Sequence, residues 1–171
     1  GSVMGRGMIF LAKLSQGIMG TENAYLLGSL LVTKFHQLAL ARQNVAKAGR
    51  RPFFFYADEF QHFVTPSMGL LLAEARKYAV GLTLAHQTLG QVRDAAHVHD
   101  ALLGNAYTRI MFRVGDDDAR KLAEGLSTFS AKDLQSLGRG EAVVRLGSST
   151  HDFNLRTLPL AEVDADVAEV R

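Results

Sequence analysis

The feature that most constrains the fold is an uninterrupted apolar run that ends in two acids. Residues Phe53–Ala57 read FFFYA, and Asp58 and Glu59 follow directly. The run lacks the alternation of apolar and polar residues that a half-exposed strand shows. A short run without alternation is typical of a strand that is covered on both faces, as in the centre of a parallel sheet. We therefore expect a central parallel strand with Asp58 at its carboxyl end.

Further apolar runs alternate with helical patterns along the chain. The other predicted strands are Gly7–Leu14, Gly81–His86, Thr108–Val114, Glu141–Leu146 and Phe153–Leu158. The predicted helices are Thr21–Lys47, Pro66–Tyr78, Val98–Leu103 and one that begins at Asp116–Asp118. Thr21 and Thr65 are the predicted caps of the first two helices, and Pro66 suits a first helical position. Strands that alternate with helices predict an α/β domain with a mainly parallel sheet.

The composition is that of a globular chain and excludes several kinds of site. Apolar residues make up 47% and charged residues 21%, which argues against general disorder. The absence of Cys removes disulfides, thiolate nucleophiles and zinc sites built on Cys. The formal charge of 19 − 17 = +2 is too small to imply nucleic acid by itself. No apolar stretch reaches the ~20 residues that a membrane-spanning helix needs.

Four residues are candidates for chemistry. Asp58 would lie where open parallel sheets bind ligands, and its carboxylate can hold Mg²⁺ through the water shell of the ion, while Glu59 can polarise an attacking water. Gln87 follows the strand Gly81–His86, and at the same sheet edge its amide can hold a water or a γ-phosphate. Arg76 can serve as an arginine finger for the nucleotide of a neighbouring subunit. The residues alone leave structural alternatives open: an acidic pair that caps a helix, a loop amide, and a solvated cation at a helix end.

The sequence resembles a known family at several separate motifs. The runs FFYADEFQHF at 54–63, LAEARKY at 72–78 and LTLAHQ at 82–87 together resemble the conjugative coupling-protein (TraD/TraG-type) group of the HerA/FtsK DNA-translocating ATPases. The resemblance covers roughly residues 8–146. It implies a RecA-like three-layer α/β domain, of which this chain is the C-terminal part. We expect Gly1 and Ser2 to be a tag remnant, residues 3–160 a partial motor domain and residues 161–171 a polar tail.

The resemblance also implies roles for single residues. The Asp58 position belongs to the Mg²⁺ site, the Glu59 position is the catalytic base, and the Gln87 position senses the γ-phosphate. The Arg76 position resembles a finger that acts on a neighbouring subunit, and Arg113, at the end of the expected strand, is a second candidate. The implied cofactors are ATP and Mg²⁺. The implied partners are DNA, further copies in a hexameric ring and the type IV secretion or conjugation machinery. The implied location is the bacterial cytoplasm, with the inner membrane reached only through regions absent here.

One departure from the family is large. The sequence contains no G-x-x-x-x-G-K-[ST] phosphate loop, which is the main source of nucleotide affinity in such enzymes and lies upstream in the family. We therefore expect the C-terminal half of an ATP-driven DNA translocase, inactive as an isolated chain. One alternative is a non-catalytic interaction module, a remnant that docks on a partner or on DNA. Another is a nuclease or other Mg²⁺ enzyme, which would need further acids at strand ends.

Overall fold

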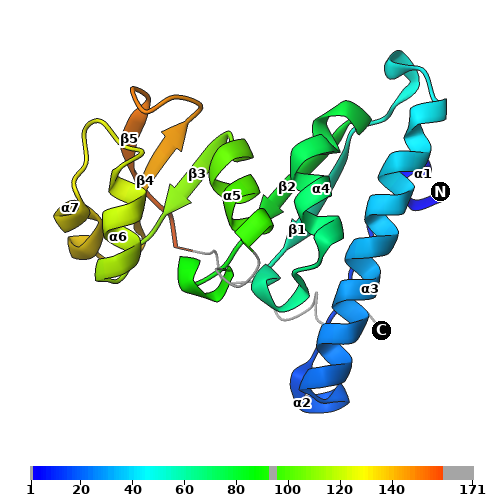
Figure 1. The fold of residues 1–171 in the computed structure, drawn as a ribbon, viewed down its shortest axis with the longest axis horizontal. Coiled ribbons are helices and arrows are strands. Elements are labelled where there is room, and N and C mark those ends of the chain that lie inside the picture. The colour runs from blue at the N-terminus through cyan, green and yellow to red at the C-terminus, as the bar shows by residue number, and fades with distance from the viewer. Residues whose placement is uncertain (1, 93–95, 160–171) are drawn as a thin grey trace. The chain divides into compact units, whose positions relative to one another are not determined.

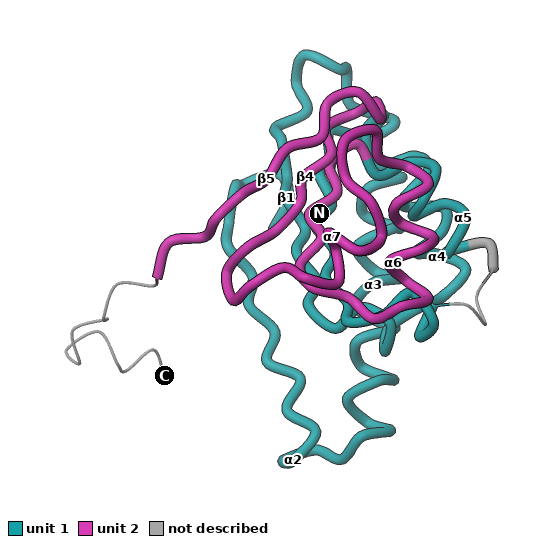
Figure 2. Tube along the Cα trace, turned by 90° about the vertical axis from the view of Figure 1, so that its left-hand side faces the viewer, with its two compact units in different colours: residues 1–106 teal, residues 107–171 magenta. Residues whose placement is uncertain are grey.

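The computed structural model describes residues 2–92 and 96–159. The chain divides into two compact units, residues 1–106 and residues 107–171 (Figure 1 and Figure 2). Each unit has a hydrophobic core of its own. The expected tag remnant at Gly1 and the expected polar tail at residues 161–171 lie outside the described residues. Within the described part of the chain, no helix has the length and apolar character needed to cross a membrane.

Unit 1 contains a parallel pair of strands and the helices that pack on it. Its α-helices are α1 (Ser2–Arg6), α2 (Gln16–Met19), α3 (Thr21–Leu40), α4 (Pro66–Glu74) and α5 (Ala96–Asn105). Its 3₁₀ turns are η1 (Ala41–Asn44), η2 (Lys47–Gly49), η3 (Phe60–Phe63), η4 (Ala75–Tyr78) and η5 (Leu89–Val92). Its strands β1 (Phe53–Ala57) and β2 (Val80–Leu84) are parallel, with Phe53 opposite Val80. The β1–α4–β2 order confirms the expected α/β class.

The two faces of β1 differ in exposure. Phe55 and Ala57 pack against a buried cluster from α3, η3, α4, η5 and α5. The members of this cluster are Val32, Phe60, Met68, Val92 and Val98. On the other face, Phe54 is 64% exposed and Tyr56 is 71% exposed. The expectation of a strand covered on both faces is therefore wrong for the part of unit 1 that is described, because its helices cover one face.

Two other expectations for unit 1 are corrected. Residues 8–14 form neither helix nor strand and pair with no described strand, so the predicted strand Gly7–Leu14 is absent. Ile9 is 88% exposed. A strand requires a hydrogen-bonded neighbour as well as an apolar pattern. The α-helix that begins at Thr21 ends at Leu40, and the chain continues in η1 rather than in α-helix to Lys47. Gly20, in the left-handed region at φ 83°, precedes this helix in place of the expected Thr21 cap.

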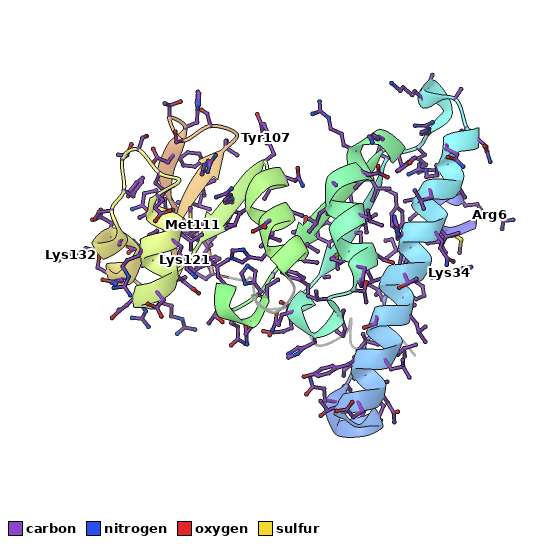
Figure 3. The ribbon with its side chains drawn as sticks, viewed as in Figure 1. Arg6, Lys34, Tyr107, Met111, Lys121 and Lys132 are labelled. Atoms are coloured by element: carbon purple, nitrogen blue, oxygen red, sulfur yellow. The ribbon has the colours of Figure 1, made fainter. Side chains whose placement is uncertain are left out.

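Unit 2 is a three-stranded antiparallel sheet with helices on one face. Its strands are β3 (Thr108–Met111), β4 (Glu141–Leu146) and β5 (Asp152–Arg156), in the order β3-β4-β5. Its helices are α6 (Asp116–Ala123) and α7 (Ala131–Ser136). Met111 and Val143 pack against Ala119 and Leu134 of these helices (Figure 3). The helix predicted from Asp116 and the strand Glu141–Leu146 are confirmed, whereas the predicted strand Thr108–Val114 ends early and runs antiparallel to its neighbour.

One carboxylate of unit 2 holds the loop between α6 and α7. Asp152 on β5 accepts hydrogen bonds from the backbone N–H and the hydroxyl of both Ser127 and Thr128, at 2.7–3.1 Å. These bonds, those of Thr128 first, hold the pKa of Asp152 well below its usual range. The loop between α6 and α7 is therefore tied to β5 while Asp152 is ionised.

A close approach between helix and turn positions the segment that follows β1. Gly28 lies on α3 directly under the ring of Phe63, the last residue of η3. A Cβ atom added at Gly28 would lie 2.1 Å from Cδ1 of that ring. Only glycine allows this contact, so Gly28 sets how closely α3 and η3 approach each other.

We expect Gly28→Ala to lower the free energy of unfolding by roughly 1–3 kcal/mol, because the new methyl group overpacks the Phe63 contact. The matched control is Gly104→Ala on α5, where a Cβ atom would meet nothing within 4 Å. This control should raise the free energy of unfolding by about 0.5–1 kcal/mol through helix propensity. Urea unfolding of both variants checks the difference, and equal effects would contradict the close approach.

Candidate functional site

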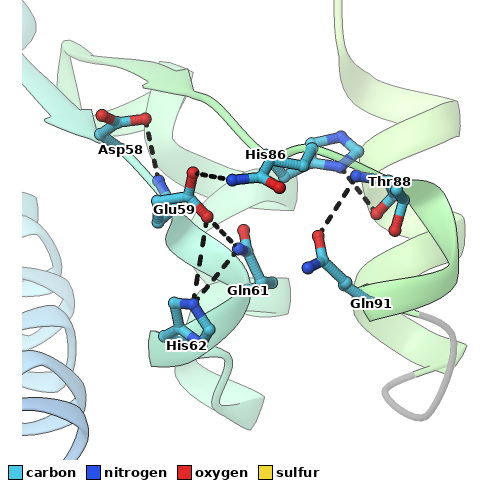
Figure 4. A network of polar contacts seen from close by, with 8 residues as sticks. Asp58, Glu59, Gln61, His62, His86, Thr88 and Gln91 are labelled. Carbon is cyan, nitrogen blue, oxygen red and sulfur yellow. Dashed lines mark hydrogen bonds and ion pairs between the residues drawn. The ribbon is translucent and has the colours of Figure 1, made fainter. Parts of the chain in front are cut away.

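The parallel strands bring the Asp58–Glu59 segment beside the loop that carries Gln87. Beyond the strand ends, Ala85 N donates to Ala57 O at 2.9 Å and Phe60 N donates to Ala85 O at 3.1 Å. These two backbone bonds flank the acidic pair and tie it to the loop after β2. Asp58 (Figure 4) and Gln87 therefore follow the carboxyl ends of adjacent parallel strands, which confirms this geometric prediction.

The backbone at Glu59 has an unusual conformation. Glu59 has φ 50° and ψ 40°, in the left-handed region, which costs a residue other than glycine about 1–2 kcal/mol. Asp58 Oδ1 accepts a hydrogen bond from Glu59 N at 3.0 Å and so helps to hold this conformation. Backbone strain of this kind occurs often at functional sites, where the surroundings stabilise it. It turns the chain at the end of β1 and directs the Glu59 side chain toward the loop of β2.

Two neutral amides hold the Glu59 carboxylate. Gln87 Nε2 donates to Glu59 Oε1 at 2.7 Å, and Gln61 Nε2 donates to Oε2 at 2.5 Å. The bond from Gln87 and then that from Gln61 lower the pKa of Glu59, with smaller contributions from the nearby His62 and His86. The Glu59 side chain is 40% exposed. It is therefore ionised at neutral pH, and each oxygen keeps a lone pair that can accept a hydrogen bond from water.

Aromatic stacking and loop hydrogen bonds hold the residues around the Glu59 carboxylate. The His62 ring stacks on Tyr25 of α3, with ring centroids 4.5 Å apart and planes at 10°. In the β2 loop, His86 Nδ1 donates to Thr88 O at 3.1 Å, and Thr88 N donates to Gln91 Oε1 at 3.2 Å. Sequence reasoning missed the part that Gln61 and His62 play, although both lie within the DEFQHF run. No spacing rule shows which residue of a 3₁₀ turn reaches back to a neighbouring carboxylate.

The residues present fit one part of a nucleotide site. Asp58 is an exposed carboxylate at the end of a parallel strand, which suits Mg²⁺, an ion that keeps several waters and takes few protein ligands. Among the described residues, no three His, Asp or Glu side chains gather as a metal cage. The sequence has no phosphate loop. The site thus fits the part of a nucleotide site that holds the metal and polarises water. The loop that binds the phosphates would have to be contributed by residues outside this sequence.

The two candidate fingers do not join this cluster. Arg76 lies in η4 just before β2, at the opposite end of the strand pair from Asp58. Strands of 5 residues separate these ends by roughly 16 Å. The Arg76 side chain is exposed and forms no hydrogen bond or ion pair with the described part of the chain. Arg113 is exposed two residues beyond β3 in unit 2, and its placement relative to Glu59 stays a prediction.

Comparison with families and known sequences gives two matches. Residues 52–164, about two thirds of the chain, match the family described as the TraM recognition site of TraD and TraG. An uncharacterized protein of Mycoplasma pneumoniae is 28% identical over 132 residues, which cover 74% of this chain and 86% of that protein.

Comparison with solved structures shows the fold. The bacterial conjugative coupling protein TrwB, in its unbound form, superimposes with a TM-score of 0.59 at 10% identity over 71% of this chain. VirB4 of Thermoanaerobacter pseudethanolicus superimposes with a TM-score of 0.51 at 21% identity over 72% of this chain. The matched region is 35% of either solved chain, so this chain spans about a third of their length. The shared fold is the RecA-like α/β fold of coupling-protein ATPases.

We expect Gln87→Leu to raise the pKa of Glu59 toward that of an ordinary glutamate, because the hydrogen bond that lowers this pKa most is lost. Gln61→Leu should raise it less. A ¹³C NMR titration of the side-chain carboxyl carbons measures both changes. Gln37→Leu, at an exposed amide of α3, is the matched control and should leave the titration unchanged. An unaltered Glu59 titration in Gln87→Leu would contradict the geometry of the site.

Proposed function

Because the chain belongs to the family of the TraM recognition site of TraD and TraG, we propose that it is the C-terminal half of a hexameric, ATP-driven DNA translocase. The chain is a relative of conjugation and type IV secretion ATPases. The observation that carries the proposal is the hydrogen bond between Gln87 and Glu59 beside Asp58, at the carboxyl edge of parallel strands. This is the edge at which open α/β sheets bind ligands.

The residues of the edge have distinct chemical roles in this proposal. Asp58 holds Mg²⁺ through coordinated water, and the ion, when bound, neutralises charge on the phosphates. Glu59 accepts the proton of the attacking water at a carboxylate oxygen. The hydrogen bonds from Gln87 and Gln61 support this role by fixing the carboxylate in place, and they keep it ionised by lowering its pKa. Gln87 exchanges its hydrogen bond to Glu59 Oε1 for one to a γ-phosphate oxygen, and so couples the state of the nucleotide to the base.

Arg76 acts on a second copy of the protein in this proposal. Its place at the amino end of β2, opposite Asp58, supports action across an interface rather than on its own site. An exposed guanidinium without a partner in the described residues is free to stabilise charge on a transferred phosphoryl group. A ring of copies would give each site one finger. Arg113, also exposed, is the second candidate.

The cofactors and partners follow from the same proposal. Solved TrwB structures hold ADP with Mg²⁺, or non-hydrolysable analogues of ATP and GTP. We extend ATP and Mg²⁺ to a longer protein that contains this chain and a phosphate loop. DNA, the hexameric ring and the conjugation machinery are the proposed partners, and the family description, which names TraM recognition, supports the last of these. The proposed location is the bacterial cytoplasm at the inner membrane.

We expect the 171-residue chain alone to bind Mg-ATP no more tightly than the millimolar range, because its sequence lacks a phosphate loop. Isothermal titration calorimetry measures this directly. A longer protein with an upstream phosphate loop is the positive control. Micromolar affinity in the isolated chain would show that the loop is not needed for binding.

In that longer protein, Glu59→Gln should leave nucleotide binding intact and slow hydrolysis by about 10²–10⁴-fold, the usual contribution of a general base. Steady-state ATPase assays with ADP release as readout measure the loss. Gln37→Glu, at an exposed position of α3, is the control for a change between these two residue types. Undiminished turnover in Glu59→Gln would assign the base to another residue.

Arg76→Ala should also abolish hydrolysis, yet mixed rings of Arg76→Ala and Glu59→Gln subunits should regain part of it. An interface between an intact base and an intact finger survives in the mixture, because the two residues come from different copies. ATPase activity as a function of mixing ratio measures this complementation. No recovery at any ratio would remove Arg76 from the role and leave Arg113 as the leading candidate.

One observation favours a second candidate function, the non-catalytic interaction module. The match to the Mycoplasma pneumoniae protein covers 86% of that protein, so a relative consists of little more than the matched region. A module of this kind would retain the fold and dock on a partner without hydrolysis. DNA transfer can be measured with the Glu59→Gln variant and with the natural sequence. Equal transfer by the two would favour the non-catalytic module.

A further inference from the structure

A hollow in unit 1, at the amino end of β2, is lined by cationic side chains. Its volume is about 480 Å³ and it is open to solvent. Its lining residues are Lys47, Arg50, Ala73, Arg76, Lys77 and Ala79. They come from η2, α4, η4 and the segments that follow η2 and η4, so residues about 30 apart in sequence meet here. Of these described lining residues, four are cationic, two are alanines and none is acidic.

The fold itself accounts for two of the nearby arginines. The Arg50 guanidinium donates to three backbone carbonyls, which are Val45 O at 2.8 Å, Lys77 O at 2.5 Å and Gln43 O at 3.4 Å. Arg42 donates to Ala79 O at 3.2 Å and also to Arg51 O. The last carbonyls of a helical turn lack partners within the turn, and Arg50 supplies one for Lys77 O of η4. Arg42 bonds Ala79 O, which lies just after η4 and also accepts a hydrogen bond from Phe53 N at 3.0 Å.

Two further cations have no such structural role. Lys47 and Arg76 are exposed, and neither side chain forms a hydrogen bond or ion pair with the residues that the structure describes. Lys77 is partly neutralised, since its Nζ lies 3.1 Å from Glu74 Oε1. Because Arg50 and Arg42 already bond the carbonyls of Lys77 and Ala79 at the end of this segment, helix-end electrostatics do not require Lys47 and Arg76. A multiply charged anion in the hollow would stabilise both.

We propose that Lys47 is a second phosphate-binding cation beside Arg76, and that Arg50 is the positioning residue that holds both at one hollow. The ligand is the phosphate chain of a nucleotide bound by a second copy of the protein, and this inference rests on the proposed role of Arg76. Arg50 suits this role because it bonds both segments that carry the cations. It donates to Gln43 O and Val45 O, just before Lys47 in the sequence, and to Lys77 O, just after Arg76. One guanidinium thus joins the two segments that carry the ligand-binding cations.

The shape and lining of the hollow favour a polyphosphate over a nucleic-acid strand. The cations surround a concave space, whereas a nucleic-acid backbone needs cations along an extended groove. Single-stranded nucleic acids also stack their bases on aromatic side chains. The hollow is walled by Ala73 and Ala79 and has no aromatic lining residue. The short alanine side chains leave room for a phosphate chain and provide no aromatic surface on which a nucleobase could stack.

The test is a titration of the 171-residue chain with inorganic tripolyphosphate at low ionic strength, followed by ¹H–¹⁵N NMR. We expect amide signals of residues 47–50 and 76–79 to shift with millimolar-range affinity. Lys47→Gln and Arg76→Gln should each weaken binding by about five- to tenfold, the loss of one charge-assisted contact. The matched controls are Lys34→Gln and Arg6→Gln, at exposed cations of unit 1 on α3 and α1 (Figure 3), and they should leave affinity within about twofold.

A double-mutant cycle separates positioning by Arg50 from a merely structural role. Arg50→Lys keeps the charge but cannot donate to three carbonyls at once. It should weaken tripolyphosphate binding by about fivefold in the natural chain and by less than twofold when Arg76→Gln is already present. The loss in melting temperature caused by Arg50→Lys should be the same in both backgrounds. Equal effects on binding in both backgrounds would remove Arg50 as a positioning residue.

The remaining outcomes decide the identity of the ligand. ATP should shift the same amides as tripolyphosphate, whereas an oligothymidylate with the same number of phosphates should bind at least fivefold more weakly. Tighter binding of the oligothymidylate at residues 47–50 would overturn the proposal in favour of nucleic acid. Weaker binding in Arg76→Gln with no change in Lys47→Gln would overturn this inference and leave the proposed function standing. Absence of any shift would overturn the inference, while the mixed-ring experiment still tests Arg76 separately.

Discussion

β1 and β2 pair in parallel, with Phe53 opposite Val80 and Ala57 opposite Leu84, and this pairing separates two groups of polar residues. At the carboxyl ends lie Asp58, Glu59 and Gln87, joined by a hydrogen bond across the strands. At the amino end of β2 lies Arg76, which lines the hollow. Antiparallel pairing would have placed the residue after one strand beside the residue before the other. The separation of these two groups to opposite ends of the strand pair requires parallel strands.

Hydrogen bonds to neutral groups hold a charged side chain at each end of the strand pair. Glu59 is held by the amides of Gln87 and Gln61, and Arg50 is held by backbone carbonyls. Within the described part of the chain Arg50 has no ion pair, and the one ion-pair contact of Glu59, to His62, is at 4.0 Å. Hydrogen bonds to neutral groups fix a charged side chain and preserve its field. This combination suits residues that must act on a charged ligand, and it costs the chain little electrostatic strain.

The family match covers residues 52–106 of unit 1 and residues 107–164 of unit 2. Unit 2 adds an antiparallel sheet whose loop is tied by Asp152, together with the exposed Arg113 and Arg139 beside a hollow of about 390 Å³. Unit 1 alone contains the strand pair with Asp58, Glu59, Arg76 and Gln87. The proposed chemistry therefore belongs to unit 1, and the role of unit 2 depends on which arginine acts as the finger.

The sequence by itself determined the parallel strand pair and the edge at which the acids and Gln87 meet. An apolar run that ends in two acids, a helix that begins at Pro66 and a second apolar run before Gln87 are local signals, and local signals define a β–α–β unit. Only the tertiary structure decided that Gln61 reaches Glu59, that Arg50 spans from Gln43 to Lys77, and that Phe54 is exposed. It also decided that residues 8–14 form no strand. The physical reason is that a hydrogen bond or a covered face needs a partner far along the chain, and periodicity says nothing about where that partner lies.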